Sequence, residues 1–191
     1  MAEEKTVSSS YVFKGRAFDV RIDTVINAEG HETTREIVEH VACVAVVPLN
    51  ADGDIVLVKQ YRKAVEKELL EIPAGGIEPG ENPDEAVRRE LQEEIGCYPG
   101  KIDRIGGFYS TPGYCTEYLY LYLASDLKPS QLQAEDTSGI VCLAVKSVQI
   151  ESMIKSGEIC DAKSIAGLLH YLKYEKKVKN QKSKVKSKIK K

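Results

Sequence analysis

A loop rich in glycine and proline leads directly into a stretch with three closely spaced glutamates. Gly75, Gly76 and Gly80 permit tight turns and let the backbone approach a ligand closely, because they have no side chain. Several carboxylates beside such a loop are suited to holding Mg²⁺ or Mn²⁺ against a phosphate, since these hard cations prefer oxygen ligands. The chemistry expected here is therefore metal-assisted attack of water on a phosphate group.

The glutamates lie on a predicted helix that begins just after this loop. Asn82 can cap the helix, and Pro83 suits its first turn. Glu90 and Glu94 are four residues apart and Glu93 is beside them, so the three carboxylates project from one face. Because like charges repel at this spacing, the cluster requires water, an arginine or a metal ion to neutralise it. The buried stripe of the same helix consists of Val87, Leu91 and Ile95.

The loop and the helix together resemble the Nudix box, a pattern of glycine, glutamate and arginine at fixed spacing. Cys97 is a mild departure at the last position, where a larger aliphatic residue is usual, although a free cysteine behaves as a small hydrophobe. The resemblance implies an α/β (α+β) fold, the Nudix α/β/α sandwich with a mixed sheet. The residues that match the fixed positions are Gly75, Glu81, Arg89, Glu90, Glu93, Glu94 and Gly96.

The resemblance also implies roles for individual side chains. Glu90 and Glu94 would be the main metal ligands, and the carbonyl of Ala74 would be a backbone ligand. Glu93 would be a secondary ligand or a hydrogen-bond partner. Arg89 would orient a neighbouring glutamate by charge-assisted hydrogen bonds, or form an ordinary ion pair with a glutamate four residues away.

A catalytic base, usually a glutamate, lies in this family in an acidic loop before the last buried strand. Ungapped alignment places Thr137 or Ser138 near that position, and a small shift brings in Glu135 or Asp136. We favour Glu135 because its side chain is longer; the alternative is a solvated acid without a catalytic role. If neither acid acts, Glu93 or a metal-bound hydroxide would suffice.

Further segments resemble the ADP-ribose pyrophosphatase branch of the family, over roughly residues 11–174. This branch implies a homodimer with exchanged N-terminal units, in which Arg35 and Glu36 reach the partner's nucleotide site. Arg62 would contact a phosphate or ribose through its guanidinium fork. The segments that carry the resemblance are 34–40, 60–62, 111–113 and 156–166.

The branch implies a nucleotide pocket as well. Arg16 and Ala17 match positions near the adenine, but neither is an aromatic residue that stacks well, so Phe13 or Phe18 would substitute. The complete set of expected substrate contacts is Arg16, Arg35, Glu36, Arg62, Gly76 and Pro112.

Hydrophobic periodicity divides the chain into four parts. We expect a flexible N-terminus at 1–10, an antiparallel β unit at 11–40, a Nudix domain at 41–174 and a basic, disordered tail at 175–191.

Three apolar runs within the domain predict strands. The run 41–47 is continuous and predicts a fully buried strand, with 55–61 returning as its hairpin partner after Asp52-Gly53. The run 140–145 predicts another buried strand. Two helices are expected at the end, at 148–156 and 162–174.

Composition fits one domain of 191 residues with an appendage, and 42% hydrophobic residues are ample for a core. The five cysteines are odd in number and show no metal-ligand spacing. We expect buried thiols in a reducing cytoplasm, without disulfides or zinc, and neither a signal peptide nor a membrane span.

The final segment from Lys173 to Lys191 contains ten lysines and one glutamate. It predicts a disordered, solubilising end, and the alternative is an arm for nucleic acid or another polyanion.

The expected function is hydrolysis of ADP-ribose, or a related nucleoside diphosphate sugar, to AMP and ribose 5-phosphate, with Mg²⁺ as cofactor and Mn²⁺ as the alternative. One rival is another diphosphate substrate, such as GDP-mannose or a nucleotide cap. A second rival is a non-catalytic nucleotide- or RNA-binding module. The intact set of repelling glutamates argues against this second rival.

Overall fold

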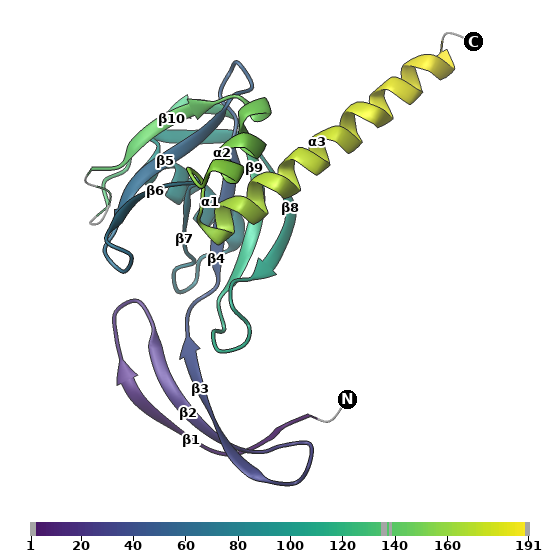
Figure 1. Ribbon diagram of the computed structural model, residues 1–191. Coiled ribbons are helices and arrows are strands. Elements are labelled where there is room, and N and C mark those ends of the chain that lie inside the picture. Colours follow the sequence, from purple (N-terminus) through teal and green to yellow (C-terminus); the bar gives the residue numbers. More distant parts are fainter. Residues whose placement is uncertain (1–2, 135–136, 138, 190–191) are drawn as a thin grey trace.

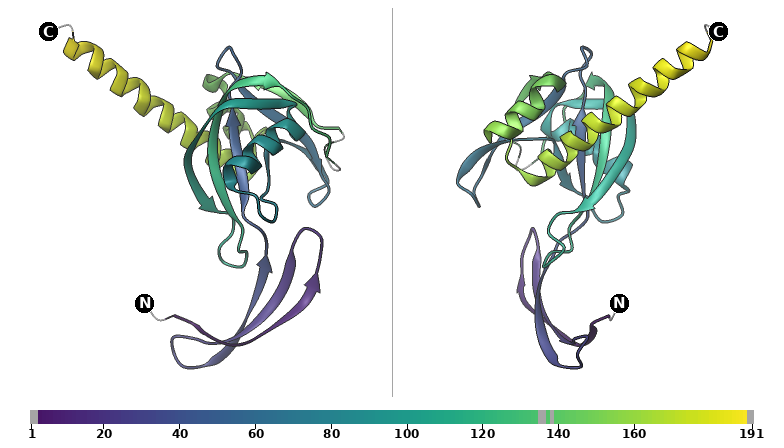
Figure 2. Two further views of the ribbon diagram at one scale, coloured as in Figure 1. Left: turned by 180° about the vertical axis from the view of Figure 1, so that it is seen from behind. Right: turned by 45° about the vertical axis from the view of Figure 1, so that its right-hand side comes forward.

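The computed structural model describes residues 3–134, 137 and 139–189. Within them, an N-terminal sheet lies at one end of the molecule, apart from a larger body that carries the other strands and the helices (Figures 1 and 2). The N-terminal sheet is antiparallel, with its strands in sequence order. Its strands are β1 (Lys5–Lys14), β2 (Asp19–Ile26) and β3 (Glu32–Glu39).

The first strand starts earlier than the sequence predicts. Lys5–Ser10, expected to be flexible, pairs with β2, and Lys5 lies opposite Ile26. The segment is exposed and, apart from Val7, polar, so hydrophobic pattern does not reveal it. Its backbone forms a strand because a neighbouring strand of matching length satisfies its hydrogen bonds.

A mixed four-stranded sheet forms the centre of the body, in the order β7-β4-β9-β8. β4 runs parallel to β9 and antiparallel to β7, and all its residues are buried, as predicted. Because side chains alternate along a strand, β4 serves two cores, one on each face of the sheet. The bounds are β4 (Cys43–Pro48), β7 (Ala74–Gly76), β8 (Cys97–Tyr109) and β9 (Tyr118–Pro129).

Helices cover both faces of this sheet, which confirms the expected α/β/α arrangement (Figure 1). Val44 and Val46 pack with Val87 and Leu91 of α1. Ala45 and Val47 belong to the opposite cluster, which includes buried residues of α2 and α3. The helices are α1 (Pro83–Glu94), the 3₁₀ turn η1 (Ser147–Gln149), α2 (Ile150–Ser156) and α3 (Ala162–Ile189).

A second sheet has the order β10-β5-β6. Its pairing corrects the expectation that β5 is the hairpin partner of β4. The turn at Gly53 forms, with its N–H donating to the carbonyl of Asn50 at 3.0 Å. However, β5 does not pair with β4 beyond a single bridge between Leu49 and Ile55, because both edges of β4 are taken by β7 and β9. The strands of this sheet are β5 (Ile55–Arg62), β6 (Lys67–Glu71) and β10 (Val141–Val145).

The last strand was expected to be buried, and this prediction is wrong. In β10, Val141 and Leu143 are exposed, and Val145 is its buried residue. β10 is an edge strand of its sheet. The apolar run therefore indicates that the segment forms a strand, but it does not indicate how deeply the strand is buried.

Helix α3 also differs from its predicted extent. It continues past Tyr174 to Ile189, through the segment expected to be disordered. Lysine favours helices, and neither glycine nor proline follows Gly167, so no residue in this segment terminates the helix. Within the described part of the chain, no helix is both long and apolar enough to cross a bilayer.

The cysteines are all free thiols, but their burial is mixed. Only Cys43 is buried; Cys97 and Cys115 are partly buried, and Cys142 and Cys160 are exposed. The expectation of buried thiols is therefore correct for one residue. The exposed cysteines lie at the sheet edge and in a helix connection, which local hydrophobicity does not distinguish from the core.

Candidate active site

Helix α1 is started by a reciprocal cap. The side chain of Asn82 accepts the N–H of Glu85 at 3.0 Å, and the Glu85 carboxylate accepts the N–H of Asn82 at 3.0 Å. Pro83 occupies the first turn, and Tyr122 of β9 donates its hydroxyl hydrogen to Asp84 at 2.7 Å. These contacts fix the start and rotation of α1, and so determine which face presents the glutamates.

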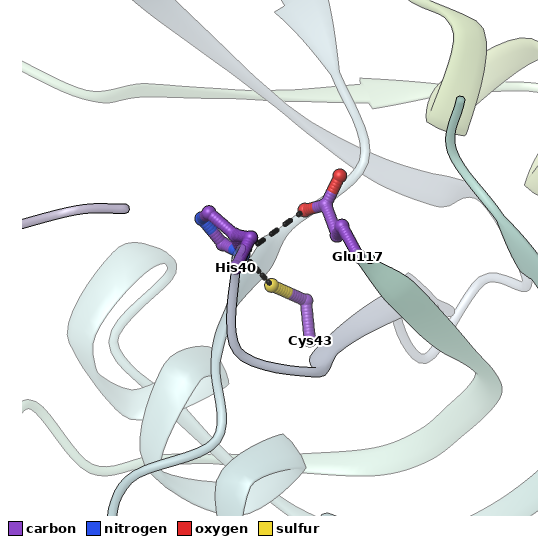
Figure 3. A group of neighbouring side chains, drawn as sticks. All are labelled: His40, Cys43 and Glu117. Carbon is purple, nitrogen blue, oxygen red and sulfur yellow. Dashed lines mark hydrogen bonds and ion pairs between the residues drawn. The ribbon is translucent and has the colours of Figure 1, made fainter. Parts of the chain in front are cut away.

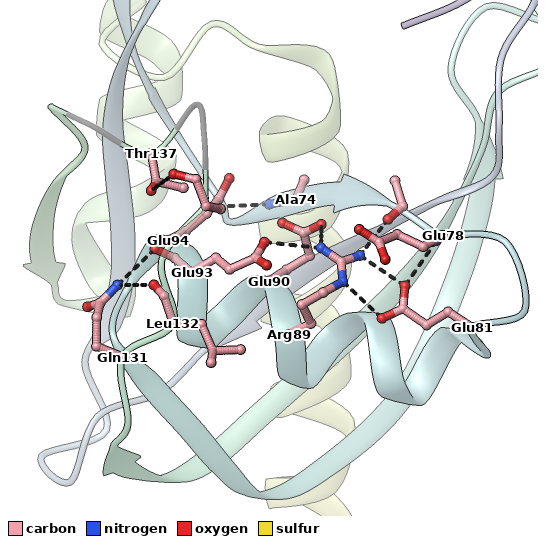
Figure 4. Close-up of polar contacts among 12 residues, drawn as sticks. Ala74, Glu78, Glu81, Arg89, Glu90, Glu93, Glu94, Gln131, Leu132 and Thr137 are labelled. Atoms are coloured by element: carbon pink, nitrogen blue, oxygen red, sulfur yellow. Dashed lines mark hydrogen bonds and ion pairs between the residues drawn. The ribbon is translucent and has the colours of Figure 1, made fainter. Parts of the chain in front are cut away.

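Arg89 links the carboxylates of this face (Figure 4). Its guanidinium binds Glu81 through two bonds of 2.9 Å, and it also donates to Glu90 at 2.6 Å and to Glu93 at 3.1 Å. A further bond of 2.7 Å reaches the carbonyl of Gly76. The predicted orienting role thus extends to three glutamates and to the loop. These bonds hold the pKa of Glu81 below its ordinary value.

Gly75 leaves room for one of these carboxylates. A Cβ atom at this position would lie 2.0 Å from an oxygen of Glu90. Any side chain here would therefore displace Glu90, which is itself buried. Close approach of backbone to carboxylate, and not a positive φ angle, is what requires glycine at this point in the loop.

Glu94 lies one helical turn beyond Glu90. It accepts the backbone N–H of Ala74 at 3.2 Å, so β7 and the end of α1 are joined (Figure 4). Burial, followed by the charge of Glu90, raises the pKa of Glu94 to about 8. Burial likewise raises the pKa of Glu90, although Arg89 opposes this.

The arrangement suits a divalent cation. Two partly desolvated carboxylates close to each other are each disfavoured in their charged form, and a bound divalent cation would compensate for the desolvation and offset the repulsion. The donors are all oxygens, which matches the preference of Mg²⁺ and Mn²⁺. Glu90 and Glu94, with Glu93 nearby and the backbone of Ala74, would hold the ion.

A second charged cluster lies beside the first and was not predicted. Glu71 is 1% exposed and accepts two bonds from Arg62, at 2.9 and 2.7 Å, and one from Lys163. Lys163 also donates to Asp161 at 2.9 Å. Arg62 and Lys163 both oppose the rise in the pKa of Glu94, so this cluster stabilises its charged form.

The signal that could have revealed this cluster is weak. Glu71 is a lone charge between Leu70 and Ile72, in a run that otherwise reads as buried strand. Its partner Lys163 is 92 residues away along the chain, so only the folded arrangement brings the two together.

Arg62 was expected to contact a phosphate or ribose. Its guanidinium is bonded to Glu71 in this structure, so the substrate contact stays a prediction.

The acidic loop follows β9, and its first residues are hydrogen-bonded to the end of α1. The side chain of Gln131 donates to the carbonyl of Glu93 at 3.2 Å, and Leu132 N–H donates to the carbonyl of Gln92 at 3.1 Å. The favoured base, Glu135, and its alternative Asp136 lie outside the described residues, as does Ser138. Thr137 donates its hydroxyl hydrogen to the carbonyl of Ala134 at 3.0 Å.

Four of the six expected substrate contacts line two hollows near the N-terminal sheet, whereas Arg62 and Gly76 lie beside Glu71 and Arg89. One, of about 200 Å³, is lined by Arg35, Glu36 and Pro112 among others, so these distant residues do come together. Arg16 helps to line the other, of about 290 Å³, together with Phe18.

Both hollows belong to a single chain, whereas the exchanged dimer would place Arg35 and Glu36 at the partner's site. Arg35 is also paired with Glu4 in this chain. The assignment of these residues to substrate therefore stays a prediction.

Comparison of the sequence with known proteins identifies the family to which the chain belongs. The NUDIX domain family matches residues 39–167. The chain is 34% identical over 182 residues to an ADP-ribose pyrophosphatase of Bacillus subtilis (strain 168), covering 94% of this chain and 98% of that protein. It is 33% identical over 178 residues to an ADP-ribose pyrophosphatase of Mycobacterium tuberculosis (strain ATCC 25618 / H37Rv), covering 88% of this chain and 84% of that protein.

A solved structure supports the fold. The crystal structure of an ADP compounds hydrolase superposes with a TM-score of 0.84 at 21% identity, over 92% of this chain and 96% of that chain. At this identity the likeness concerns the arrangement of strands and helices and not the ligand.

We predict that Gly75→Ala weakens metal binding. The new Cβ must push the Glu90 carboxylate away from its position, so affinity for Mg²⁺ or Mn²⁺ should fall by at least about tenfold. Metal-dependent thermal shifts measured without nucleotide check this. Gly113→Ala is the matched control, because a Cβ there meets nothing within 4 Å. Equal metal affinity of both variants would contradict the role given to Gly75.

We predict that Glu71→Gln lowers the free energy of unfolding at pH 7 by about 2–3 kcal/mol, because it leaves two cations without their shared carboxylate. Burial raises the pKa of Glu71, but the hydrogen bonds and charges of Arg62 and Lys163 together outweigh it, so the folded-state pKa is lowered. Its stabilisation is therefore complete above the unfolded-state pKa and is lost as the pH falls through the folded-state pKa.

The measurement is urea unfolding of the wild type and Glu71→Gln at pH 7 and at about pH 4. The difference between them should shrink at the lower pH. Glu68→Gln on the same strand is the control, since its exposed pair with Lys59 contributes little. A difference that grows on acidification would show that the cluster is not held by an ionised Glu71.

Proposed function

Because this chain belongs to the NUDIX domain family and is a Nudix hydrolase, we propose that it hydrolyses the diphosphate bond of ADP-ribose, releasing AMP and ribose 5-phosphate. The observation that carries the proposal is the pair Glu90 and Glu94, held on one face of α1 against the Gly75 loop. The relatives named as ADP-ribose pyrophosphatases, aligned over nearly their whole lengths, support this substrate.

The reaction joins a water oxygen to one phosphorus and breaks the bond from that phosphorus to the bridging oxygen. Members of this family generally use a divalent metal, and we propose Mg²⁺, with Mn²⁺ as the alternative. When bound, the ion would supply charge stabilisation for the phosphate oxygens and a lowered pKa for water. Glu90 and Glu94 would hold it, with the Ala74 carbonyl and Glu93 as further ligands.

The remaining residues of the site position the metal ligands or transfer protons. Arg89 donates hydrogen bonds to Glu90 and Glu93 and would hold their carboxylates in position for the metal and the substrate. Glu135 would remove the proton from the attacking water; it belongs to the loop after β9, in which Gln131 is hydrogen-bonded to the carbonyl of Glu93. A carboxylate can act as this base when it comes within hydrogen-bond distance of the water.

The two hollows near the N-terminal sheet would hold the rest of the substrate. We assign Arg35, Glu36 and Pro112 to one, and Arg16 to the other, with Phe18 available to stack on the base. Arg62 and the backbone of Gly76 lie nearer the glutamates and would face the phosphates.

The N-terminal sheet also supports a homodimer. β1 is an exposed edge strand that carries the apolar side chains Val7, Val12 and Phe13 at the surface. A strand edge with apolar residues is commonly covered by a partner, and a second copy exchanging this unit would cover it. We further propose a cytoplasmic location, which five free thiols suit.

The substrate proposal is tested with a panel. The full chain, with Mg²⁺ and separately with Mn²⁺, is offered ADP-ribose, GDP-mannose, another nucleoside diphosphate sugar and a capped nucleotide. We expect the highest kcat/KM for ADP-ribose, read as AMP release. A preference for GDP-mannose or for the cap would establish the corresponding rival, and inertness towards all four would favour a non-catalytic module.

We predict that Glu94→Gln lowers metal-dependent kcat by at least about 100-fold, which corresponds to about 2.7 kcal/mol of transition-state stabilisation. The amide keeps the shape of the side chain and its reach to Ala74, so circular dichroism and the midpoint of thermal unfolding should change little. Glu158→Gln removes an exposed carboxylate elsewhere and is the control. Turnover by Glu94→Gln equal to this control would refute the metal assignment.

We predict that Glu135→Gln lowers kcat by about 10²–10⁴-fold with little change in metal affinity, as expected for loss of a general base. Asp136→Asn is the matched control on the neighbouring residue and should keep most of the activity. The reverse result would move the base to Asp136, and full activity of both would remove the loop from the chemistry.

We predict that the protein is a dimer in solution, with the mass of two chains by light scattering coupled to size exclusion. Val12→Lys places a charge on the exposed face of β1 and should shift the equilibrium to monomer. Val65→Lys is the control, since Val65 is equally exposed in a turn of the body. A monodisperse wild-type monomer would overturn the exchanged-unit proposal.

A further inference from the structure

His40, Cys43 and Glu117 point toward one another at the junction between the N-terminal sheet and the body (Figure 3). The Cys43 sulfur lies 3.8 Å from Nδ1 of His40, and the same nitrogen lies 3.8 Å from an oxygen of Glu117. One donor atom from each residue falls within 4.8 Å of the other two. His40 follows β3, Cys43 opens β4, and Glu117 directly precedes β9.

These separations are close to those of a tetrahedral zinc site. With bonds of about 2.3 Å to sulfur and about 2.0 Å to nitrogen or oxygen, neighbouring donors around Zn²⁺ are about 3.3–3.6 Å apart. Small side-chain rotations would close the remaining gap. A thiolate, an imidazole and a carboxylate form a mixed set that a borderline-soft cation accepts, whereas the all-oxygen box suits a hard one.

We propose that His40, Cys43 and Glu117 form a second metal site, which binds Zn²⁺ or a similar borderline-soft divalent cation and keeps a fourth position for water. This site is separate from the carboxylates of α1 in both chemistry and ligands. The cysteine spacing did not predict it, because only one of the three ligands is a cysteine and Glu117 is distant in the sequence.

The metal-free groups are arranged so that binding must displace protons. Burial, followed by the charge of Glu117, raises the pKa of the Cys43 thiol, so the sulfur is protonated without a cation. Nδ1 of His40 lies 2.8 Å from the carbonyl of Val41, which can only accept, so this nitrogen carries the hydrogen of that bond. Coordination releases the thiol proton and requires the imidazole proton to occupy Nε2.

The location gives the site a structural consequence. The backbone N–H of His40 donates to Thr116 Oγ1 at 2.9 Å, and that hydroxyl donates to the carbonyl of His40 at 3.1 Å. Val38 and Tyr114 are joined by a bond of 2.7 Å. A cation bound next to these bonds would fasten the connector between the two parts of the chain to the loop before β9.

Both hollows border this junction. His40 lines the one that contains Arg16, and Cys115 and Thr116 line the one that contains Arg35. Occupancy of the proposed site would therefore hold the walls of both hollows in place.

Cobalt substitution tests the proposal without nucleotide or turnover. The full chain is freed of metal with a chelator and titrated with Co²⁺. We expect one equivalent to produce a thiolate-to-cobalt charge-transfer band in the near ultraviolet and the visible bands of tetrahedral Co²⁺. The all-oxygen box cannot give the charge-transfer band, since it lacks sulfur.

Single-residue variants show which side chains produce the charge-transfer band. Cys43→Ser should remove the charge-transfer band, while Cys142→Ser and Cys160→Ser, at the exposed thiols, should keep it. Because Cys43 is buried and its variant can misfold, His40→Ala and Glu117→Gln at partly exposed positions are measured as well. Each should weaken Co²⁺ and Zn²⁺ binding by at least about tenfold.

Separate outcomes distinguish this proposal from the proposed function. Glu94→Gln should keep the cobalt spectrum, and His40→Ala should lose the rise in thermal midpoint that Zn²⁺ gives the wild type. Absence of a charge-transfer band in the wild type, or a band that survives Cys43→Ser, would overturn the zinc site while leaving hydrolysis with Mg²⁺ unaffected. A band lost in Glu94→Gln would also overturn it.

Discussion

The structure depends on keeping several carboxylates close together in a partly buried place. Glu81, Glu90 and Glu93 share one guanidinium, that of Arg89, which satisfies them without filling the space beside them. Among the described residues, Glu94 receives a backbone N–H and the nearby charges of a second cluster. The site therefore contains charge that the protein balances incompletely, and this imbalance is what would give it affinity for a cation.

The surrounding elements follow from this requirement. Gly75 is a glycine because the Glu90 carboxylate occupies the place of its side chain. The reciprocal cap at Asn82 and the bond from Tyr122 to Asp84 hold α1 in rotation, since a helix turned by one residue would move every carboxylate by about 100°. β4 supports both sides, because its alternating side chains supply one core beneath α1 and another beneath α3.

The parts of the chain outside this centre are joined to it by polar contacts between distant segments. Glu71 ties β6 to α3 through Lys163, and Thr116 ties the loop before β9 to the connector that leads from the N-terminal sheet. A polar contact in a buried place is specific, because only a correctly placed partner compensates for its desolvation. Such contacts determine which distant segments lie next to each other, whereas apolar packing supplies most of the stability of the fold.

The sequence by itself determined the elements whose signals are local. The box, the cap of α1, the buried stripe and the depth of β4 depend on spacing along one helix or strand, and each was predicted, except that Ile95 lies just past α1 and is partly buried and that Val41 is exposed. Tertiary structure alone decided the pairing of β5, the exposure of β10, the ion pair of Glu71 with Lys163 and the meeting of His40 with Glu117. These features join residues far apart in the chain, and periodicity carries no information about which distant segments become neighbours.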